Sequence, residues 1–203
     1  LGNEHGTVVA AGTGVVTLGV GPNRVARIDG WGHIMGDAGS GYWIGQQALM
    51  AVMRDYDGRG EHTALTAVVK ERWPDLSEAY IDLQALPDRI STVASFAASV
   101  AELADSDQIA AWICARAGKE LADSAATALR RVGLENSGSV PVAAIGGVFE
   151  GQHVRESFTQ ELHTRHSGAQ VQAVTGNGLD GVQLLAQLPA GHALQELISR
   201  CRR

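Results

Sequence analysis

Cysteine, proline and aromatic residues are all scarce in this sequence of 203 residues. It contains two cysteines and five prolines, and only 5% of its residues are aromatic. Cys114 and Cys201 are far apart and form no CxxC pair, so the sequence encodes neither a disulfide framework nor a cysteine metal cluster. Unpaired cysteines are typical of a reducing compartment, and we expect a cytoplasmic protein.

Long apolar runs and concentrated positive charge are also absent. No apolar stretch approaches the roughly 18 residues of a membrane span, and residues 1–5 do not begin a signal peptide. The net charge is −6 with both signs interspersed, whereas a nucleic-acid surface needs a basic patch. We interpret Arg200, Arg202 and Arg203 as a solvated chain end. We therefore expect no nucleic acid and no membrane as partner.

The length and the 45% content of hydrophobic residues predict one compact domain with a substantial core. The chain begins with Leu1, and an apolar run starts at Thr7 with almost no lead-in, so we interpret it as a truncated chain. No oligomeric state follows from the sequence, and a homodimer stays open.

The first quarter of the sequence has the pattern of a β-meander followed by a helix. Short β-rich runs at 7–11, 15–20 and 25–28 are separated by glycine-containing turns, which predicts antiparallel strands. After a glycine-rich stretch, apolar residues recur at helical spacing, which predicts a helix over 39–56.

The middle of the chain, from 63 to 133, is predicted to be helical, with breaks near Pro74 and Pro87. Ser77, Ser91 and Asp107 are the predicted N-caps. The last of these caps opens the longest helix, which Gly133 ends and which should pack on the sheet. Its apolar stripe consists of Ile109, Ile113, Ala117, Leu121, Ala125, Leu129 and Val132.

The final third alternates between strand and helix patterns. We predict a strand over 140–145, a helix over 154–164, a strand over 169–174 and a helix over 179–188. A meander demands antiparallel neighbours and these crossovers demand parallel ones, so the fold class is α/β with a mixed β-sheet.

The first motif with chemical content is Gly12-Thr13-Gly14, a tight turn between two predicted strands. Its glycines leave backbone N–H groups unshielded, and such a turn can hold an anion. An ordinary hairpin turn is the alternative. A dinucleotide fingerprint is excluded, because no helix follows Gly14.

The second motif is the glycine-rich stretch from Gly30 to Gly45, GWGHIMGDAGSGYWIG. So many glycines cost folding entropy, which favours a backbone that approaches a ligand closely. Asp37 either caps the following helix or accepts hydrogen bonds from sugar hydroxyls, and Trp31 is either a sugar contact or a core aromatic.

The third motif is Gly146-Gly147, which follows a buried strand and precedes a helix. Ligands in open α/β sheets lie beyond the carboxyl ends of strands, so a nucleotide fits here, although a plain strand-to-helix turn has the same pattern.

Over nearly the whole chain, these three motifs together resemble the N-acetylglucosamine kinase branch of the BadF/BadG/BcrA/BcrD ATPase family, within the actin-like ATPase superfamily. The glycine-rich stretch is similar to the family's sugar-binding loop, the first motif to its second phosphate loop, and the third to its adenosine loop. The resemblance implies a ribonuclease-H-like (actin-like ATPase) lobe with flanking helices. It also implies ATP-dependent phosphorylation of a small-molecule sugar, N-acetylglucosamine at its 6-hydroxyl, with Mg²⁺ on the phosphates.

The resemblance assigns a role to each matching residue. The implied ATP-binding residues are Gly12, Thr13, Gly14, Ala94, Gly146, Gly147 and Gly178. The implied sugar-binding residues are Val15, Val16, Gly30, Trp31, Gly32 and Asp37. Ala94 and Gly178 match the family pattern only loosely.

The sequence departs from the family pattern at one point. The family's amino-terminal lobe supplies the first phosphate loop and a catalytic Asp, whose equivalent falls before Leu1. We therefore interpret residues 1–203 as the carboxy-terminal lobe, nominate no catalytic residue within them, and expect no kinase activity from them alone.

Two other functions stay open. One is an activating ATPase of the CoA-reductase or dehydratase type, with an iron–sulfur cluster, for which Cys114 on a helix away from the glycine loops offers poor support. The other is a non-catalytic sugar-binding lobe. Ser40 lacks the GxSxG frame of a hydrolase, and His163 and His166 are predicted to be solvent-exposed rather than metal ligands.

Overall fold

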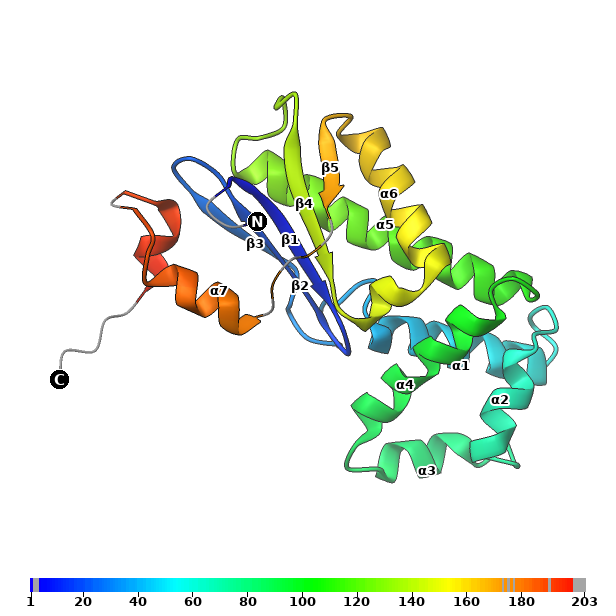
Figure 1. The fold of residues 1–203 in the computed structure, drawn as a ribbon. Helices are drawn as coiled ribbons and strands as arrows, with labels where there is room; N and C mark the ends of the chain where they lie inside the picture. The colour runs from blue at the N-terminus through cyan, green and yellow to red at the C-terminus, as the bar shows by residue number, and fades with distance from the viewer. Residues whose placement is uncertain (2–3, 173, 175, 177, 190, 199–203) are drawn as a thin grey trace.

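The computed structural model describes residues 1–203 except 2–3, 173, 175, 177, 190 and 199–203 (Figure 1). Cys201 and the three arginines at 200, 202 and 203 therefore lie outside the described residues. In the described part, no helix is both long enough and apolar enough to cross a bilayer.

Five strands form one sheet in the order β3-β2-β1-β4-β5. Strands β1 (Gly6–Ala11), β2 (Val15–Val20) and β3 (Val25–Ile28) form the predicted antiparallel meander. Strand β4 (Val140–Ile145) pairs in parallel with β1, and β5 (Ala169–Gln172) pairs in parallel with β4. The prediction of a mixed sheet is confirmed.

Helix α5 (Gln108–Arg131) crosses one face of the sheet and contacts β1, β2 and β3 (Figure 1). Helix α6 (Gln152–Arg165) packs along it. Of the predicted stripe on α5, all members are buried except the partly buried Ile109. Gly133 has a φ of +80°, as the predicted left-handed stop requires.

Helix α7 (Gly178–Leu185) lies on the opposite side of the sheet from α5. Its residues share a cavity of about 670 Å³ with Val8, Leu18 and Ala143. Side chains alternate along a strand, so Val8 faces α7 while its neighbour Val9 faces the core on the α5 side.

Four helices gather beyond the carboxyl ends of β1 and β4 (Figure 1). They are α1 (Gly41–Tyr56), α2 (Leu65–Arg72), α3 (Ala79–Ala85) and α4 (Arg89–Leu103). The chain breaks near Pro74 and Pro87, and Asp107 caps α5 by accepting from the Ala110 N–H at 2.8 Å, all as predicted.

Two of the predicted caps are wrong. Ser77 precedes the N-cap of α3 and instead bonds the Asp75 carboxylate through its N–H at 2.9 Å and its hydroxyl at 2.6 Å. Ser91 lies inside α4, where its hydroxyl donates to the Asp88 carbonyl. Before α3 the turn at Asp75 uses the serine, and α4 begins at Arg89, two residues before Ser91.

The last elements are shorter than predicted. Strand β5 ends at Gln172, and Val174 is not in the strand. Helix α7 ends at Leu185 rather than at Leu188. Two short 3-10 turns complete the described structure, η1 (Gly147–Glu150) and η2 (Ala193–Leu197).

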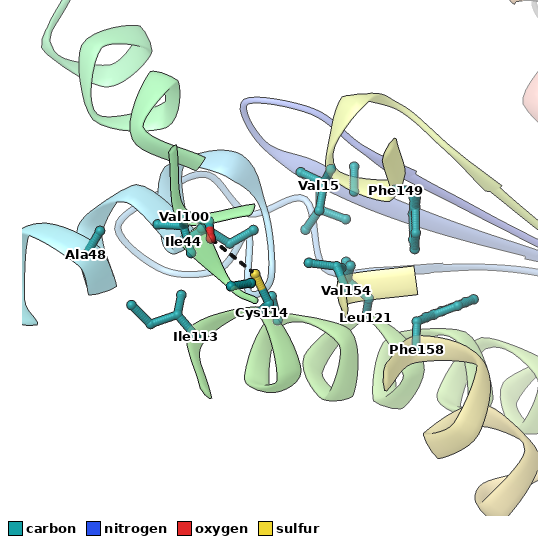
Figure 2. Packing of buried hydrophobic residues seen from close by; sticks show 14 of the residues in the cluster. Val15, Ile44, Ala48, Val100, Ile113, Cys114, Leu121, Phe149, Val154 and Phe158 are labelled. Carbon is teal, nitrogen blue, oxygen red and sulfur yellow. Dashed lines mark hydrogen bonds between the residues drawn. The ribbon is translucent and has the colours of Figure 1, made fainter. Parts of the chain in front are cut away.

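The core lies between α5, α6, the sheet and the inner faces of α1 and α4 (Figure 2). Phe149 and Phe158 meet edge to face with ring centroids 5.0 Å apart. Cys114 lies at the end of this core nearest α4, with its sulfur 4.0 Å from the Val100 carbonyl oxygen. The apolar interior therefore joins the sheet to the helical block that stands over its strand ends.

Candidate functional site

The parallel pairing of β1 with β4 brings the first and third motifs to one edge of the sheet. Ala10 pairs with Ile145, so the turn at Gly12–Gly14 and the pair Gly146-Gly147 leave the sheet side by side. Gly146 has a φ of +101°, and a Cβ there would collide with the Ala11 carbonyl. Only glycine fits this contact between the two loops.

The turn between β1 and β2 is held by its carbonyl groups. Gly41 N donates to the Gly12 carbonyl at 2.8 Å, and Tyr42 N donates to the Thr13 carbonyl at 3.0 Å. Within the described structure, the N–H groups of Thr13 and Gly14 make no hydrogen bond. Consecutive free N–H groups in a turn form a concavity that attracts an anion.

A cavity of about 760 Å³ opens beside this turn. It runs between α4 and the segment from η1 to the start of α6, and the wall contributed by α4 carries small side chains. Its lining includes four of the residues predicted to bind ATP: Gly12, Thr13, Ala94 and Gly147.

The far end of the cavity is polar. His153 Nε2 lies 2.8 Å from Asp105 Oδ1, and this contact joins the turn after α4 to the start of α6. Glu102 and Glu150 also line this part. The cavity thus runs from a turn suited to anions, past small side chains, to a polar rim.

Asp37 lies on the other side of the turn from this cavity. Its carboxylate faces Gly14, where a Cβ would lie 2.7 Å from Asp37 Oδ2. Asp37 is only 9% exposed, yet its carboxylate has no hydrogen-bond or ionic partner in the described part of the chain. Neither oxygen is among the fully buried side-chain atoms that lack a partner, so the carboxylate reaches solvent and can accept a hydrogen bond from a ligand at this position.

The alternative role of Asp37 as a helix cap is wrong. The cap of α1 is Ser40, whose hydroxyl accepts from the Trp43 N–H at 3.2 Å. Asp37 has a φ of +57° and lies three residues too early for capping. Its side chain is therefore free for another acceptor role.

The role of Asp29 was missed in the sequence analysis. Its Oδ1 accepts from the Asp37 N–H at 2.7 Å, and its Oδ2 accepts from the Ala38 N–H at 3.0 Å. These bonds span eight and nine residues of irregular backbone, and no periodicity or cap pattern predicts such a contact. The position of Asp29 directly before the glycine-rich stretch was the one signal available in the sequence.

Trp31 is 57% exposed, so the alternative of a core aromatic is wrong. The Arg27 guanidinium lies 4.7 Å from the centroid of its ring. Val16, 40% exposed, lies next to Gly30, and Gly32 is in open space. These residues form an open apolar surface beside Asp37.

Two predicted site residues lie elsewhere. The Val15 side chain is 4% exposed in the core, so only its backbone, which abuts Gly30, faces the loop. Gly178 is the first residue of α7, the helix on the opposite side of the sheet from α5.

Cys114 was expected to lie away from the glycine loops, but its side chain lines the same cavity as Gly12 and Gly147. Burial raises the pKa of its thiol to about 11. The expectation failed because α5 runs beneath the cavity, a contact that sequence distance hides.

The two candidate histidines differ. His163 is exposed and its Nε2 lies 2.9 Å from the Ala169 carbonyl oxygen. His166 is 7% exposed with Nε2 2.8 Å from the Leu134 carbonyl oxygen, so its predicted exposure is wrong. The described residues contain no group of three or more His, Cys, Asp or Glu suited to a metal ion.

Known proteins resemble the chain over most of its length. An N-acetyl-D-glucosamine kinase of Dictyostelium discoideum is 28% identical over 193 residues, which cover 91% of this chain and 60% of that protein. An N-acetylmuramic acid/N-acetylglucosamine kinase of Clostridium acetobutylicum is 25% identical over 196 residues, 91% of this chain and 61% of that one. The chain thus spans about three fifths of the length of these curated relatives.

Solved structures confirm the predicted fold. A protein of Chromobacterium violaceum, provisionally named N-acetylglucosamine kinase, superposes with a TM-score of 0.67 at 28% identity, covering 90% of this chain and 59% of that one. A Porphyromonas gingivalis protein of the same provisional name gives a TM-score of 0.63 at 20% identity, covering 92% and 62%, which speaks for the fold alone. The α/β fold of the ribonuclease-H-like, actin-like ATPase type is therefore confirmed.

The family model described as the BadF/BadG/BcrA/BcrD ATPase family matches residues 1–183, and this agrees with the resemblance carried by the three glycine motifs. Since that match covers most of the sequence, the chain belongs to the BadF/BadG/BcrA/BcrD ATPase family.

Proposed function

We propose that this chain is the carboxy-terminal lobe of an ATP-dependent kinase that phosphorylates an amino sugar, N-acetylglucosamine at its 6-hydroxyl. The names of the curated relatives support the reaction class and the sugar. Their greater length supports a further lobe that would supply the general base.

One observation carries the proposal. The Gly12–Gly14 turn has the cavity of about 760 Å³ on one side and the unpaired Asp37 carboxylate on the other. A kinase needs a nucleotide and an acceptor on either side of a phosphate-binding element. This turn, with its free N–H groups, has that relation to both.

The nucleotide would occupy the cavity. The N–H groups of Thr13 and Gly14 would donate to phosphate oxygens, and these donors need no reorganisation because Gly41 and Tyr42 already hold the turn's carbonyls. The bare backbone at Gly147 and the small side chain of Ala94 would leave room for the adenosine.

The sugar would lie against the glycine-rich loop. Asp37 would accept a hydrogen bond from a ring hydroxyl, and a charged acceptor makes such a bond stronger than a neutral one. The exposed Trp31 ring would cover an apolar face of the sugar, with Gly30 and Gly32 allowing close approach.

Phosphoryl transfer asks a protein mainly for positioning and for stabilisation of charge. Mg²⁺ is usually held by one or two carboxylates together with substrate phosphates, so the described residues are compatible with it without forming a protein cage. When bound, it would neutralise phosphate charge. We assign no magnesium ligand and no general base to this chain.

The test is ADP release by the full polypeptide with a panel of N-acetylglucosamine, glucosamine and N-acetylmuramic acid. We expect the highest kcat/KM with N-acetylglucosamine and phosphate on its 6-hydroxyl, identified by NMR of the product. Equal ADP release with and without every sugar would refute the kinase proposal. Phosphorylation by residues 1–203 alone would refute the assignment of the base to another lobe.

An activating ATPase with an iron–sulfur cluster receives less support. Cys114 is the one cysteine in the described part of the chain, and its buried thiol has a raised pKa that disfavours the thiolate a cluster needs. Iron and acid-labile sulfide in the purified protein would favour this alternative.

A further inference from the structure

We infer that Asp29 is the positioning residue that aims the Asp37 carboxylate at the sugar. The inference rests on the proposed function, since it concerns the acceptor that Asp37 offers to a sugar hydroxyl. Asp29 holds the backbone of the loop in place, because both of its carboxylate oxygens accept hydrogen bonds from backbone N–H groups there.

The Asp29 side chain closes the glycine-rich loop from within. Oδ1 accepts from Asp37 N at 2.7 Å and lies 3.5 Å from Trp31 N, and Oδ2 accepts from Ala38 N at 3.0 Å. Groups from the beginning and the end of the loop therefore converge on one carboxylate. This ties the backbone of Trp31 to that of Asp37.

The backbone at both ends of this contact is left-handed. Asp29 and Asp37 have φ values of 54° and 57°, and they are the only residues other than glycine with positive φ in the described part of the chain. Such a conformation is unfavourable for most residues and persists where surrounding contacts fix it. The bond from Asp37 N to Asp29 is such a contact.

The loop leaves no space for another arrangement around Asp29. A Cβ at Gly36 would collide with Asp29 Oδ1, so the carboxylate occupies the volume that a side chain there would need. Gly36 N also donates to the Gly32 carbonyl at 2.8 Å, which folds the intervening residues into a tight turn. The loop is thus built around the Asp29 carboxylate.

Arg27 braces the opposite side of the same loop. Its Nε donates to the Asp29 carbonyl at 3.2 Å, and its guanidinium also donates to the Gly30 carbonyl. The same guanidinium lies over the Trp31 ring. Arg27 therefore holds the Trp31 side while Asp29 holds the Asp37 side.

Asp29 is the contact that sets the direction of the Asp37 side chain. The Asp37 carboxylate has no hydrogen-bond partner in the described structure, so its place beside Gly14 depends on where the backbone of Asp37 is held. Without the bond to Asp29, that backbone can leave the left-handed region and swing the carboxylate away from Gly14. A displacement of about 1 Å in a site of this kind can cost up to roughly 100-fold in rate.

The test is Asp29→Asn in the full polypeptide, assayed by ADP release. Asn tolerates left-handed backbone and its Oδ1 can still accept, but its NH2 group cannot, so one of the two bonds from Asp37 N and Ala38 N is lost. We expect the KM for N-acetylglucosamine to rise about ten-fold and the KM for ATP to stay within about two-fold. General loosening of the fold would change both.

A double variant separates positioning from an independent effect. If Asp29 acts through Asp37, Asp29→Asn combined with Asp37→Asn should lower sugar kcat/KM no more than about two-fold beyond Asp37→Asn alone. Independent effects would multiply.

The matched control is Asp75→Asn, because Asp75 likewise accepts from a backbone N–H, that of Ser77, but in the loop before α3. It should behave as the wild type. Asp29→Gly, which removes the carboxylate and accepts a positive φ without strain, repeats the measurement if the Asn variant fails to fold.

The two possible failures are distinguishable. A wild type that turns over no amino sugar overturns the proposed function and this inference with it. An active wild type whose sugar KM is unmoved by Asp29→Asn and Asp29→Gly, or a double variant with multiplied effects, overturns the assignment of Asp29 alone.

Discussion

Asp37 and Asp29 illustrate how single residues of one type take different tasks in one loop. Asp37 leaves its carboxylate unpaired beside Gly14, whereas Asp29 uses both oxygens on backbone N–H groups. Local sequence left the role of Asp37 open between cap and ligand, because Asp is favoured at helix N-termini. Ser40 decided the matter, since it lies directly before the first residue of α1.

The first prediction concerns Asp37. Asp37→Asn removes a charged acceptor, and a hydrogen bond to a charged group is worth about 1.5–3 kcal/mol, so sugar kcat/KM should fall about 10- to 150-fold. The KM for ATP should change little. Steady-state ADP release with each substrate varied in turn measures both, with the exposed Asp57→Asn as control. An unchanged sugar kcat/KM would contradict the role of Asp37.

The second prediction concerns Cys114. Burial raises its pKa to about 11, so the neutral thiol is the form that the folded state favours. The contribution of the neutral thiol to the free energy of unfolding is therefore complete below the ordinary pKa of 9.0. It is lost as pH rises toward about 11. Iodoacetamide should leave Cys114 unmodified in folded protein at pH 8 and modify it in urea, as peptide mass spectrometry would detect. Rapid labelling of the folded protein would contradict this.

At the scale of elements, a long helix with strong apolar periodicity was predicted correctly, whereas the start of a short helix was not. The stripe on α5 repeats over six turns, and no tertiary contact had to be known to place it. Helix α3 spans only Ala79–Ala85, too short for a periodic signal, so the cap near Ser77 rested on residue type alone. In the structure Ser77 bonds the Asp75 carboxylate instead of capping α3.

The third prediction concerns the cap of α5. Burial, the largest single influence, favours protonation of Asp107, but hydrogen bonds from Ala110 N, Ala64 N and the Thr63 hydroxyl together lower its pKa below 3.8. The contribution of the charged Asp107 carboxylate to the free energy of unfolding is present above pH 3.8. It is lost as pH falls through the lowered pKa. Asp107→Asn should lower the free energy of unfolding by about 1.5–3 kcal/mol at pH 7.

Urea unfolding of Asp107→Asn between pH 3 and pH 7 measures this difference, which should shrink at the acid end. Asp88→Asn is the control, because Asp88 starts α4 without a side-chain cap bond. A difference that stays constant with pH would contradict the role of the Asp107 charge.

The fourth prediction concerns the hydroxyls of β1 and β2 that face the core. Thr17 is fully buried and its hydroxyl has no partner in the described structure. Thr17→Val should raise the free energy of unfolding by about 1 kcal/mol, because an unpaired buried hydroxyl is replaced by a methyl group. Thr63→Val is the opposite case, since the Thr63 hydroxyl bonds Asp107 at 2.9 Å, and it should destabilise. Thermal unfolding measures both, and the Tm should rise for Thr17→Val and fall for Thr63→Val.

For the whole molecule, the parallel contact of β1 with β4 creates the candidate site. The family resemblance assigned Gly12–Gly14 and Gly146-Gly147 to one ATP site, whereas the strand patterns alone did not predict that β1 pairs with β4. The cavity could not be predicted, because its walls come from α4, η1 and α6, whose packing depends on contacts between segments far apart in the sequence. Cys114 in its lining was missed for the same reason.

The fifth prediction concerns that cavity. Ala98 is exposed on the α4 wall, so Ala98→Trp should fill the space without disturbing the core. ATP at 100 times its Kd should raise the free energy of unfolding of the wild type by about 2.7 kcal/mol, and the variant should lose most of this gain. Thermal shift with and without ATP measures it. Ala67→Trp, exposed on α2, is the control, and equal shifts in all three proteins would contradict nucleotide binding here.

The order of strands in the sheet also governs how this chain can be assembled during synthesis. The β1–β3 meander can form as soon as it emerges, but the neighbour on the other edge of β1 is made only after the entire helical block. Until then a row of backbone groups on β1 stays unsatisfied, and pairing across such a long loop is slow. Nascent chains of this length are therefore expected to need shielding from aggregation until β4 arrives.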